Sequence, residues 1–230
     1  MTEPGLLLIR GLGHSGSTIL DLALGAHPQL IGLGEAVRVL ERPRLGEEHK
    51  GPQQLRGDLR FERRCTCGEL AGDCPVWGPL LAWLPAHDDR PLPEKFNRLI
   101  EPLTASSPRW LVESFQADEQ LLEAQALGRP VRVIQLTRDV RSWVHSESRR
   151  GVERHGRGGT VGWRSMLRWW RINRCWEQRL NRSGCAVFRL GYEELALAPE
   201  QALRQLCAWL EVGFDPAMLQ PGLNLSLIHI

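Results

Sequence analysis

Apolar and polar positions alternate along the 230-residue chain with two periods, that of strands and that of helices. Short apolar runs, several of them β-branched, predict strands at residues 6–10, 110–113, 131–137 and 186–190. Longer stretches with helical spacing predict helices at residues 17–25, 117–127, 139–150, 163–180 and 199–210. Strands that alternate with helices are typical of an α/β fold in which a central parallel sheet lies between two layers of helices.

The length favours one domain over residues 1–224, because 230 residues with 42% hydrophobic side chains can bury one sizeable core. Between residues 42 and 92 proline, glycine and charged residues interrupt the pattern, and we expect an insertion there with little regular structure. No apolar run approaches the roughly 18 residues needed to cross a bilayer, so no membrane span is expected. The start of the chain lacks the features of a secretory signal, which favours a cytoplasmic location.

Arginine is concentrated in one part of the chain. Residues 129–189 hold 15 arginines, no lysine and four acidic residues, although the whole chain has a net charge of only +2. A guanidinium group matches the oxygens of a phosphate, so this concentration favours a polyanionic ligand, and a solvated helix face is the alternative for about half of these arginines. The apolar stripe within the same segment predicts a helix face in the core: Met166, Leu167, Trp170, Ile172 and Trp176.

A glycine-rich turn, Gly11-Leu-Gly-His-Ser-Gly-Ser-Thr18, joins the first predicted strand to the first predicted helix. It fits the phosphate-binding pattern G-x-x-x-x-G-K-[ST] except at Ser17, where the pattern has lysine. Its glycines let successive backbone amides point at one anion, and the start of the helix adds a partial positive charge. The turn therefore predicts an oxyanion site, with glycine used only for shape as the alternative. Three hydroxyls are further donors: Ser15, Ser17 and Thr18.

The missing lysine narrows the phosphate chemistry. In nucleotide triphosphatases that lysine spans two phosphates, while magnesium is held by the next hydroxyl and by an acid at a strand end. Here the strand that ends at Thr137 is followed by Arg138. A group donor that carries no triphosphate and binds no metal needs neither that lysine nor the acid. We therefore expect a site for such a donor, without metal. A magnesium-dependent small-molecule kinase is an alternative.

Three motifs follow one another in a recognisable order. The glycine-rich turn is followed by Ala26-His27-Pro28 and Gly32-Leu-Gly-Glu35, then by Leu136-Thr-Arg-Asp-Val-Arg-Ser-Trp-Val-His-Ser146, then by Gly191-Tyr-Glu-Glu-Leu195. Over residues 6–215 this order resembles the bacterial sulfotransferases related to tyrosylprotein sulfotransferases. The resemblance implies a P-loop-like three-layer fold and an enzyme of the EC 2.8.2 type. Such an enzyme moves a sulfuryl group from 3′-phosphoadenosine-5′-phosphosulfate (PAPS) to a hydroxyl or amine. An Arg-rich nucleic-acid-binding module is a further alternative.

The resemblance also implies which residues hold the donor. By this resemblance, the 5′-phosphosulfate is bound by the turn residues Gly13, His14, Ser15, Gly16, Ser17 and Thr18. The resemblance also implies that Arg138 and Ser146 bind the 3′-phosphate. An arginine at a strand end and a serine two turns into the next helix can converge on one phosphate. Tyr192 is placed near the nucleotide. A simple ion pair between Arg138 and Asp139, and an ordinary buried role for Tyr192, are the alternatives.

Two residues are candidates for catalysis. His14 stands where many relatives have a lysine or arginine that steadies the bridging oxygen of the leaving phosphate, and an imidazole can donate the same hydrogen bond. Glu35 matches the proposed general base of the tyrosylprotein branch, which takes the proton of the acceptor. The alternatives are a histidine bonded to the loop backbone and a glutamate that caps a helix starting near Ala36.

Other features leave the acceptor and the ends of the chain open. The run Val112-Glu-Ser-Phe-Gln116 lacks a cation that relatives often carry there, and we name no acceptor, no nucleic-acid partner and no membrane partner. Zinc needs four ligands, and only His49 or His87 is near Cys65, Cys67 and Cys74, so a loop of buried thiols is expected there rather than a metal. Residues 225–230 resemble a translated sequencing adaptor, so we expect a non-native tail on a truncated chain.

Overall fold

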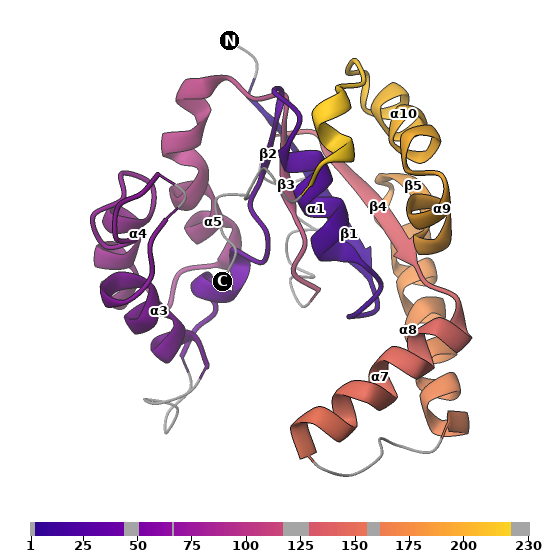
Figure 1. Ribbon diagram of the computed structural model, residues 1–230. Coiled ribbons are helices and arrows are strands. Elements are labelled where there is room, and N and C mark those ends of the chain that lie inside the picture. The colour runs from indigo at the N-terminus through magenta and orange to yellow at the C-terminus, as the bar shows by residue number, and fades with distance from the viewer. Residues whose placement is uncertain (1–2, 44–50, 66, 117–128, 156–161, 222–230) are drawn as a thin grey trace.

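The computed structural model describes residues 3–43, 51–65, 67–116, 129–155 and 162–221 (Figure 1). Its centre is a sheet of five strands in the order β2-β3-β1-β4-β5. The strands are β1 (Gly5–Gly11), β2 (Leu30–Gly32), β3 (Trp110–Glu113), β4 (Val131–Thr137) and β5 (Ala186–Gly191). Every neighbouring pair is parallel, so the carboxyl ends of all five strands lie along one edge of the sheet.

Helices connect these strands and cover both faces of the sheet, which confirms the predicted α/β class. The longer helices are α1 (Ser17–Gly25), α3 (Gly51–Phe61), α5 (Leu92–Ile100), α7 (Val140–His155), α8 (Gly162–Ser183) and α10 (Pro199–Leu210). The shorter ones are α2 (Val37–Leu40), α4 (Trp77–Trp83), α9 (Tyr192–Leu197), η1 (Leu84–Ala86), η2 (Glu101–Ser106) and η4 (Pro216–Leu219). None of the described helices is long and apolar enough to cross a bilayer.

Strand β1 shows how the sheet divides two cores. Leu6 and Leu8 are fully buried in the core shared with α2, α3, α4, α5 and α8, while Leu7 and Ile9 are fully buried in the core shared with α1, α9 and α10. Because side chains alternate along a strand, four successive apolar residues are needed to face both layers. The uninterrupted apolar run is therefore the signature of a central strand.

The predicted insertion at residues 42–92 needs correction. Little regular structure was expected there, yet helices α3 and α4 both fall inside it, and Figure 1 shows them grouped with α5 beside the sheet. Strand β2 was not predicted, because only three residues pair with β3 and so short a run carries no period. The helix expected at residues 117–127 lies outside the described residues.

Candidate functional site

The glycine-rich turn lies between β1 and α1, at the carboxyl edge of the sheet. Gly11 ends β1 so close to β4 that a Cβ atom would lie 2.2 Å from the carbonyl oxygen of Leu136, which only glycine permits. The Gly11 amide donates to Oε1 of Gln116 at 2.7 Å. His14 (φ 71°) and Gly16 (φ 95°) both adopt the left-handed region, so the backbone reverses tightly before α1 begins. The predicted strand, turn and helix are all present.

Arg138 and Tyr192 both contact this turn. The Tyr192 ring packs on Gly16, where a Cβ atom would lie 2.4 Å from Cδ2 of the ring. The Arg138 guanidinium carbon lies 4.7 Å from the centroid of the same ring, and Nη1 of Arg138 donates to the carbonyl of His14 at 3.1 Å. The segments that follow β1, β4 and β5 thus meet at one point, where a cation faces the expected anion site.

The alternative role of Arg138, a bond to its neighbour Asp139, is not the arrangement found. The Asp139 carboxylate accepts from the amide and the guanidinium of Arg141, at 2.9 and 3.0 Å, and these bonds hold the pKa of Asp139 below its usual value. The backbone of Arg138 is itself held, since Nε1 of Trp169 donates to its carbonyl at 2.9 Å.

The first turns of helix α7 are hydrogen-bonded to the glycine-rich turn and to α9. Nε1 of Trp143 donates to the carbonyl of Gly13 at 2.8 Å. The Glu193 carboxylate accepts from the Asp139 amide at 3.2 Å and from Oγ of Ser142 at 3.3 Å, so it caps the start of the helix. Ser146, which is half-buried, is three residues beyond Trp143 and therefore lies on the helix face that Trp143 turns to the loop.

The His14 side chain lies close to an acidic residue on α7, Glu147. Its Nε2 lies 3.9 Å from Oε2 of Glu147, and Oε1 of Glu147 accepts from Nη1 of Arg168 at 2.9 Å. His14 and Glu147 are 37% and 25% exposed, so water screens this pair only in part. The imidazole consequently lies at the surface of the turn, within ion-pair distance of α7.

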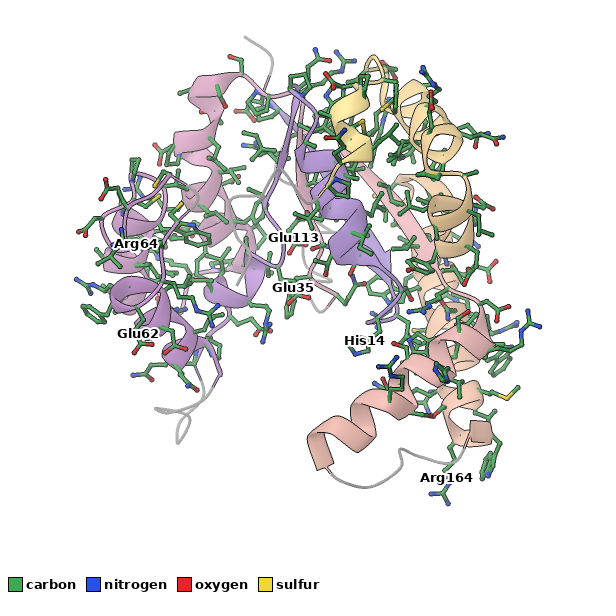
Figure 2. The ribbon with its side chains drawn as sticks, in the orientation of Figure 1. His14, Glu35, Glu62, Arg64, Glu113 and Arg164 are labelled. Atoms are coloured by element: carbon green, nitrogen blue, oxygen red, sulfur yellow. The ribbon has the colours of Figure 1, made fainter. Side chains whose placement is uncertain are left out.

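Glu35 lies at the same edge of the sheet, in the loop after β2. Figure 2 shows Glu35 and His14 along this edge, and the strand order places β3 between their two strands. The Glu35 carboxylate accepts from Nη1 of Arg38 at 3.0 Å. It does not cap α2, whose first residue follows Ala36 without a side-chain cap. The buried carboxylate of Asp21 accepts from the amide of Gly34 at 3.3 Å and so fixes the loop that carries Glu35.

Two polar atoms in this region are suited to a bound anion. Among the described residues, Oγ of Ser15 and Nε of Arg138 are buried without a hydrogen-bond partner. Buried donors of this kind are costly unless a ligand or water satisfies them, and they occur at binding sites. The turn therefore fits a phosphate-bearing ligand, whose oxygens accept hydrogen bonds. Thr18 is exposed and Ser17 half-buried, so both hydroxyls lie within reach of solvent at the start of α1.

Several residues that support the site were missed in the sequence. Gln116 braces the start of the turn, and Trp143, Glu147 and Glu193 hold α7. Trp143 and Glu193 lie within the quoted motifs, which was the available signal. Within the run Val112–Gln116, Glu113 has a structural role, because its fully buried carboxylate forms an ion pair with Arg10 at 3.3 Å. That pair joins β1 to β3 within the sheet.

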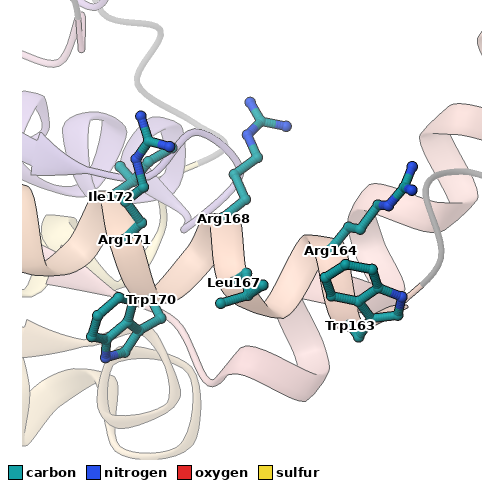
Figure 3. A pocket seen from close by; sticks show the side chains of 7 residues that line it. All are labelled: Trp163, Arg164, Leu167, Arg168, Trp170, Arg171 and Ile172. Atoms are coloured by element: carbon teal, nitrogen blue, oxygen red, sulfur yellow. The ribbon is translucent and has the colours of Figure 1, made fainter.

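The apolar stripe of α8 departs from its prediction. Trp176 is buried as expected, but Met166, Leu167 and Trp170 are each more than half exposed. Figure 3 shows three arginines, among them Arg168, on one side of the helix and the apolar groups Trp163, Leu167 and Trp170 on the other. The core-face interpretation is therefore wrong for the first half of α8 and holds for its second half.

Known proteins resemble this chain over nearly its whole length. The curated Protein-tyrosine sulfotransferase A of Caenorhabditis elegans is 24% identical over 238 aligned residues, which cover 100% of this chain and 56% of that protein. The chain thus spans little more than half the length of that relative. Two solved structures share its fold. The sulfotransferase domain from the curacin biosynthetic pathway is 21% identical with a TM-score of 0.63, and that from the olefin synthase of Synechococcus PCC 7002 is 21% identical with a TM-score of 0.66.

Each of these two alignments covers 96% of this chain and 78% of the other. The family resemblance noted in the motifs also extends to a whole-family profile. The profile described as the Sulfotransferase family matches residues 6–216, which include β1, the glycine-rich turn, Arg138 and Tyr192. The chain belongs to the sulfotransferase family.

Proposed function

We propose that this chain transfers a sulfuryl group from PAPS to a hydroxyl or amine acceptor. The observation that carries the proposal is the contact between the lysine-free turn and two residues that follow other strands, Arg138 directly after β4 and Tyr192 directly after β5. A phosphosulfate needs amide and hydroxyl donors, which the turn supplies. A second, separate phosphate needs a cation a short distance away, and Arg138 at the end of β4 supplies it.

The proposed mechanism assigns one task to each group. Amides and hydroxyls of the turn bind the 5′-phosphosulfate, while Arg138 and Ser146 bind the 3′-phosphate and so orient the donor. His14 donates a hydrogen bond to the bridging oxygen as negative charge develops on the leaving phosphate. Glu35 accepts the proton of the acceptor's hydroxyl or amine as the new bond to sulfur forms. The donor carries the sulfuryl group and its leaving phosphate, so no step assigned to these residues calls for a metal.

The two alternative functions, a kinase and a nucleic-acid-binding module, fit these residues less well. A kinase that used this turn would place an ammonium group between the β- and γ-phosphates, whereas Ser17 carries only a hydroxyl. A nucleic-acid module would use the arginines together as a phosphate-binding surface, whereas Arg138 and Arg168 are engaged with Tyr192 and Glu147 at the turn. The absence of nucleic-acid and membrane partners, the bacterial source and the cytoplasmic location stay predictions.

Two measurements test the proposal. Calorimetric titration should show that adenosine 3′,5′-bisphosphate binds without metal and more tightly than ATP with magnesium. Incubation with radiolabelled PAPS and a panel of phenols, sugars and amines should transfer label to at least one acceptor. Tighter binding of ATP that requires magnesium, with no binding of the bisphosphate, would remove the basis of the proposal.

A further inference from the structure

Three cysteines gather in the segment between α3 and α4, away from the glycine-rich turn. The sulfur atoms of Cys65, Cys67 and Cys74 all lie within 4.8 Å of one another, and those of Cys65 and Cys74 are 3.4 Å apart. Cys65 and Cys74 are buried, whereas Cys67 is exposed. Figure 2 shows Arg64, which precedes Cys65, beside the sheet and well apart from His14.

The backbone around the cluster is folded to bring these sulfurs together. The Gly68 amide donates to the carbonyl of Cys65 at 2.9 Å, and the Cys65 amide donates to the carbonyl of Glu69 at 2.8 Å. Gly68 adopts φ 93°, which lets the chain turn back directly after Cys67. The amide of Cys74 is held by the carbonyl of Leu70 at 3.0 Å. The three thiols are thus presented by a hydrogen-bonded loop.

The spacing of the sulfurs agrees with a thiolate-bound cation. Zinc binds thiolate at about 2.3 Å in tetrahedral geometry, which places two sulfurs of one site about 3.8 Å apart. The separations here, 3.4 Å for the buried pair and at most 4.8 Å for the others, span that value. Three sulfurs and no carboxylate in the set select a soft cation over magnesium or calcium.

We propose that Cys65, Cys67 and Cys74 bind a zinc-class divalent cation. A fourth ligand would complete a tetrahedral site. Of the two histidines near these cysteines in the sequence, His49 lies outside the described residues. His87 does not supply that ligand, because its ring is stacked on Trp83 with centroids 4.0 Å apart and its Nδ1 lies 2.9 Å from the carbonyl of Trp83. Each thiol that becomes a ligand releases its proton to solvent.

The role of the cation is structural. Cys65, Cys74 and Trp77 belong to the same buried cluster, so the cation joins the segment after α3 to the start of α4 within that core. A cation here would stabilise the helices beside the sheet and take no part in sulfuryl transfer. This separation makes the metal site and the proposed function independently testable.

The test uses the full chain purified under reducing conditions. Elemental analysis should find about one zinc per chain, and replacement by Co²⁺ should give the sulfur-to-cobalt charge-transfer absorption of thiolate ligation. Cys67→Ser and Cys74→Ser should each lower the metal content at least tenfold after dialysis. Cys175→Ser, which changes an exposed cysteine on α8, should leave it unchanged. Affinity for adenosine 3′,5′-bisphosphate should be the same with and without the cation.

Cys67→Ser gives the decisive measurement if Cys74→Ser does not fold, because Cys67 is exposed and its hydroxyl substitute disturbs no packing. Full metal content in folded Cys67→Ser would overturn the assignment, and so would metal-free wild-type protein that takes up no Co²⁺. A disulfide between Cys65 and Cys74, found by mass spectrometry in protein prepared without oxidant, would also overturn it.

Discussion

Glu147 Oε2 lies 3.9 Å from Nε2 of His14, although one residue is on α7 and the other in the turn after β1. The second oxygen of Glu147 is held by Arg168 of α8, at 2.9 Å. A carboxylate in this place orients the imidazole and stabilises a positive charge on it. We therefore expect Glu147 to act as a positioning residue for His14, the group proposed to touch the leaving phosphate.

Replacing Glu147 with glutamine keeps the size of the side chain and removes its charge. We expect Glu147→Gln to lower kcat about tenfold and to leave the KM for the donor nearly unchanged, because the loss concerns the charge on His14 in the transition state. Initial rates at varied PAPS give both constants. Glu200→Gln on α10, an exposed residue paired with Arg204, is the matched control. A rise in KM with unchanged kcat would assign Glu147 to donor binding instead.

The second prediction concerns Gly16, because its lack of a side chain lets the Tyr192 ring pack directly on the turn. An alanine Cβ there would lie 2.4 Å from the ring, at φ 95°, so Gly16→Ala forces both a strained backbone and a displaced ring. We expect a loss of about 1–3 kcal/mol in the free energy of unfolding and weaker donor binding. Urea unfolding and calorimetric titration measure the two effects.

Gly57→Ala serves as the control for Gly16→Ala, since a Cβ at Gly57 on α3 meets nothing within 4 Å. It should leave the stability unchanged or slightly raised, because alanine is the better helix former. Unchanged stability and donor affinity in Gly16→Ala would mean that the contact with Tyr192 contributes nothing.

Glu35 is tested by separating acceptor chemistry from donor binding. Glu35→Gln should slow transfer by about 10²- to 10⁴-fold, which is the usual contribution of a general base, while affinity for adenosine 3′,5′-bisphosphate stays within about twofold of wild type. Single-turnover rates and calorimetry give the two quantities, with the exposed Glu94→Gln as control. If donor affinity falls as far as the rate, Glu35 supports the turn and another residue takes the proton.

Much of the fold could be predicted because each long strand carries its own local signal. Four successive apolar residues from Leu6 to Ile9 mark a strand buried on both faces. Helix α4 had no such signal, since it begins Trp-Gly-Pro and glycine and proline are poor helix formers. Position 78 needs glycine, because a Cβ atom there would lie 2.4 Å from the carbonyl oxygen of Gly72. This contact is visible only in the folded chain.

The contacts among the predicted site residues could be anticipated where they join residues of the quoted motifs, while their roles stay predictions. The glycine-rich turn, Arg138 and Tyr192 meet as their motifs imply. The bonds of Glu147 and Glu193 depend on where α7 lies relative to the turn and α9, which no local sequence pattern predicts. Helical spacing likewise identified the apolar face of α8, but what covers a face is a tertiary property, and Trp170 is 54% exposed.

Arg138 provides the last prediction, because two ligands that differ in one phosphate can isolate its role. A charge-assisted hydrogen bond contributes about 1.5–3 kcal/mol, and each 1.4 kcal/mol changes affinity tenfold. Arg138→Ala should therefore weaken adenosine 3′,5′-bisphosphate by about 10- to 100-fold. Adenosine 5′-monophosphate has no 3′-phosphate, so its affinity should fall much less.

The bond from Arg138 to the carbonyl of His14 makes the comparison sharper. Loss of that bond loosens the turn and weakens both ligands equally, so the difference between the two losses isolates the contact with the 3′-phosphate. Arg141→Ala is the matched control, since Arg141 lies three residues after Arg138, is 88% exposed and is paired with Asp139. If Arg138→Ala weakens both ligands to the same degree, Arg138 braces the turn through His14 and Tyr192, and the 3′-phosphate must be bound elsewhere.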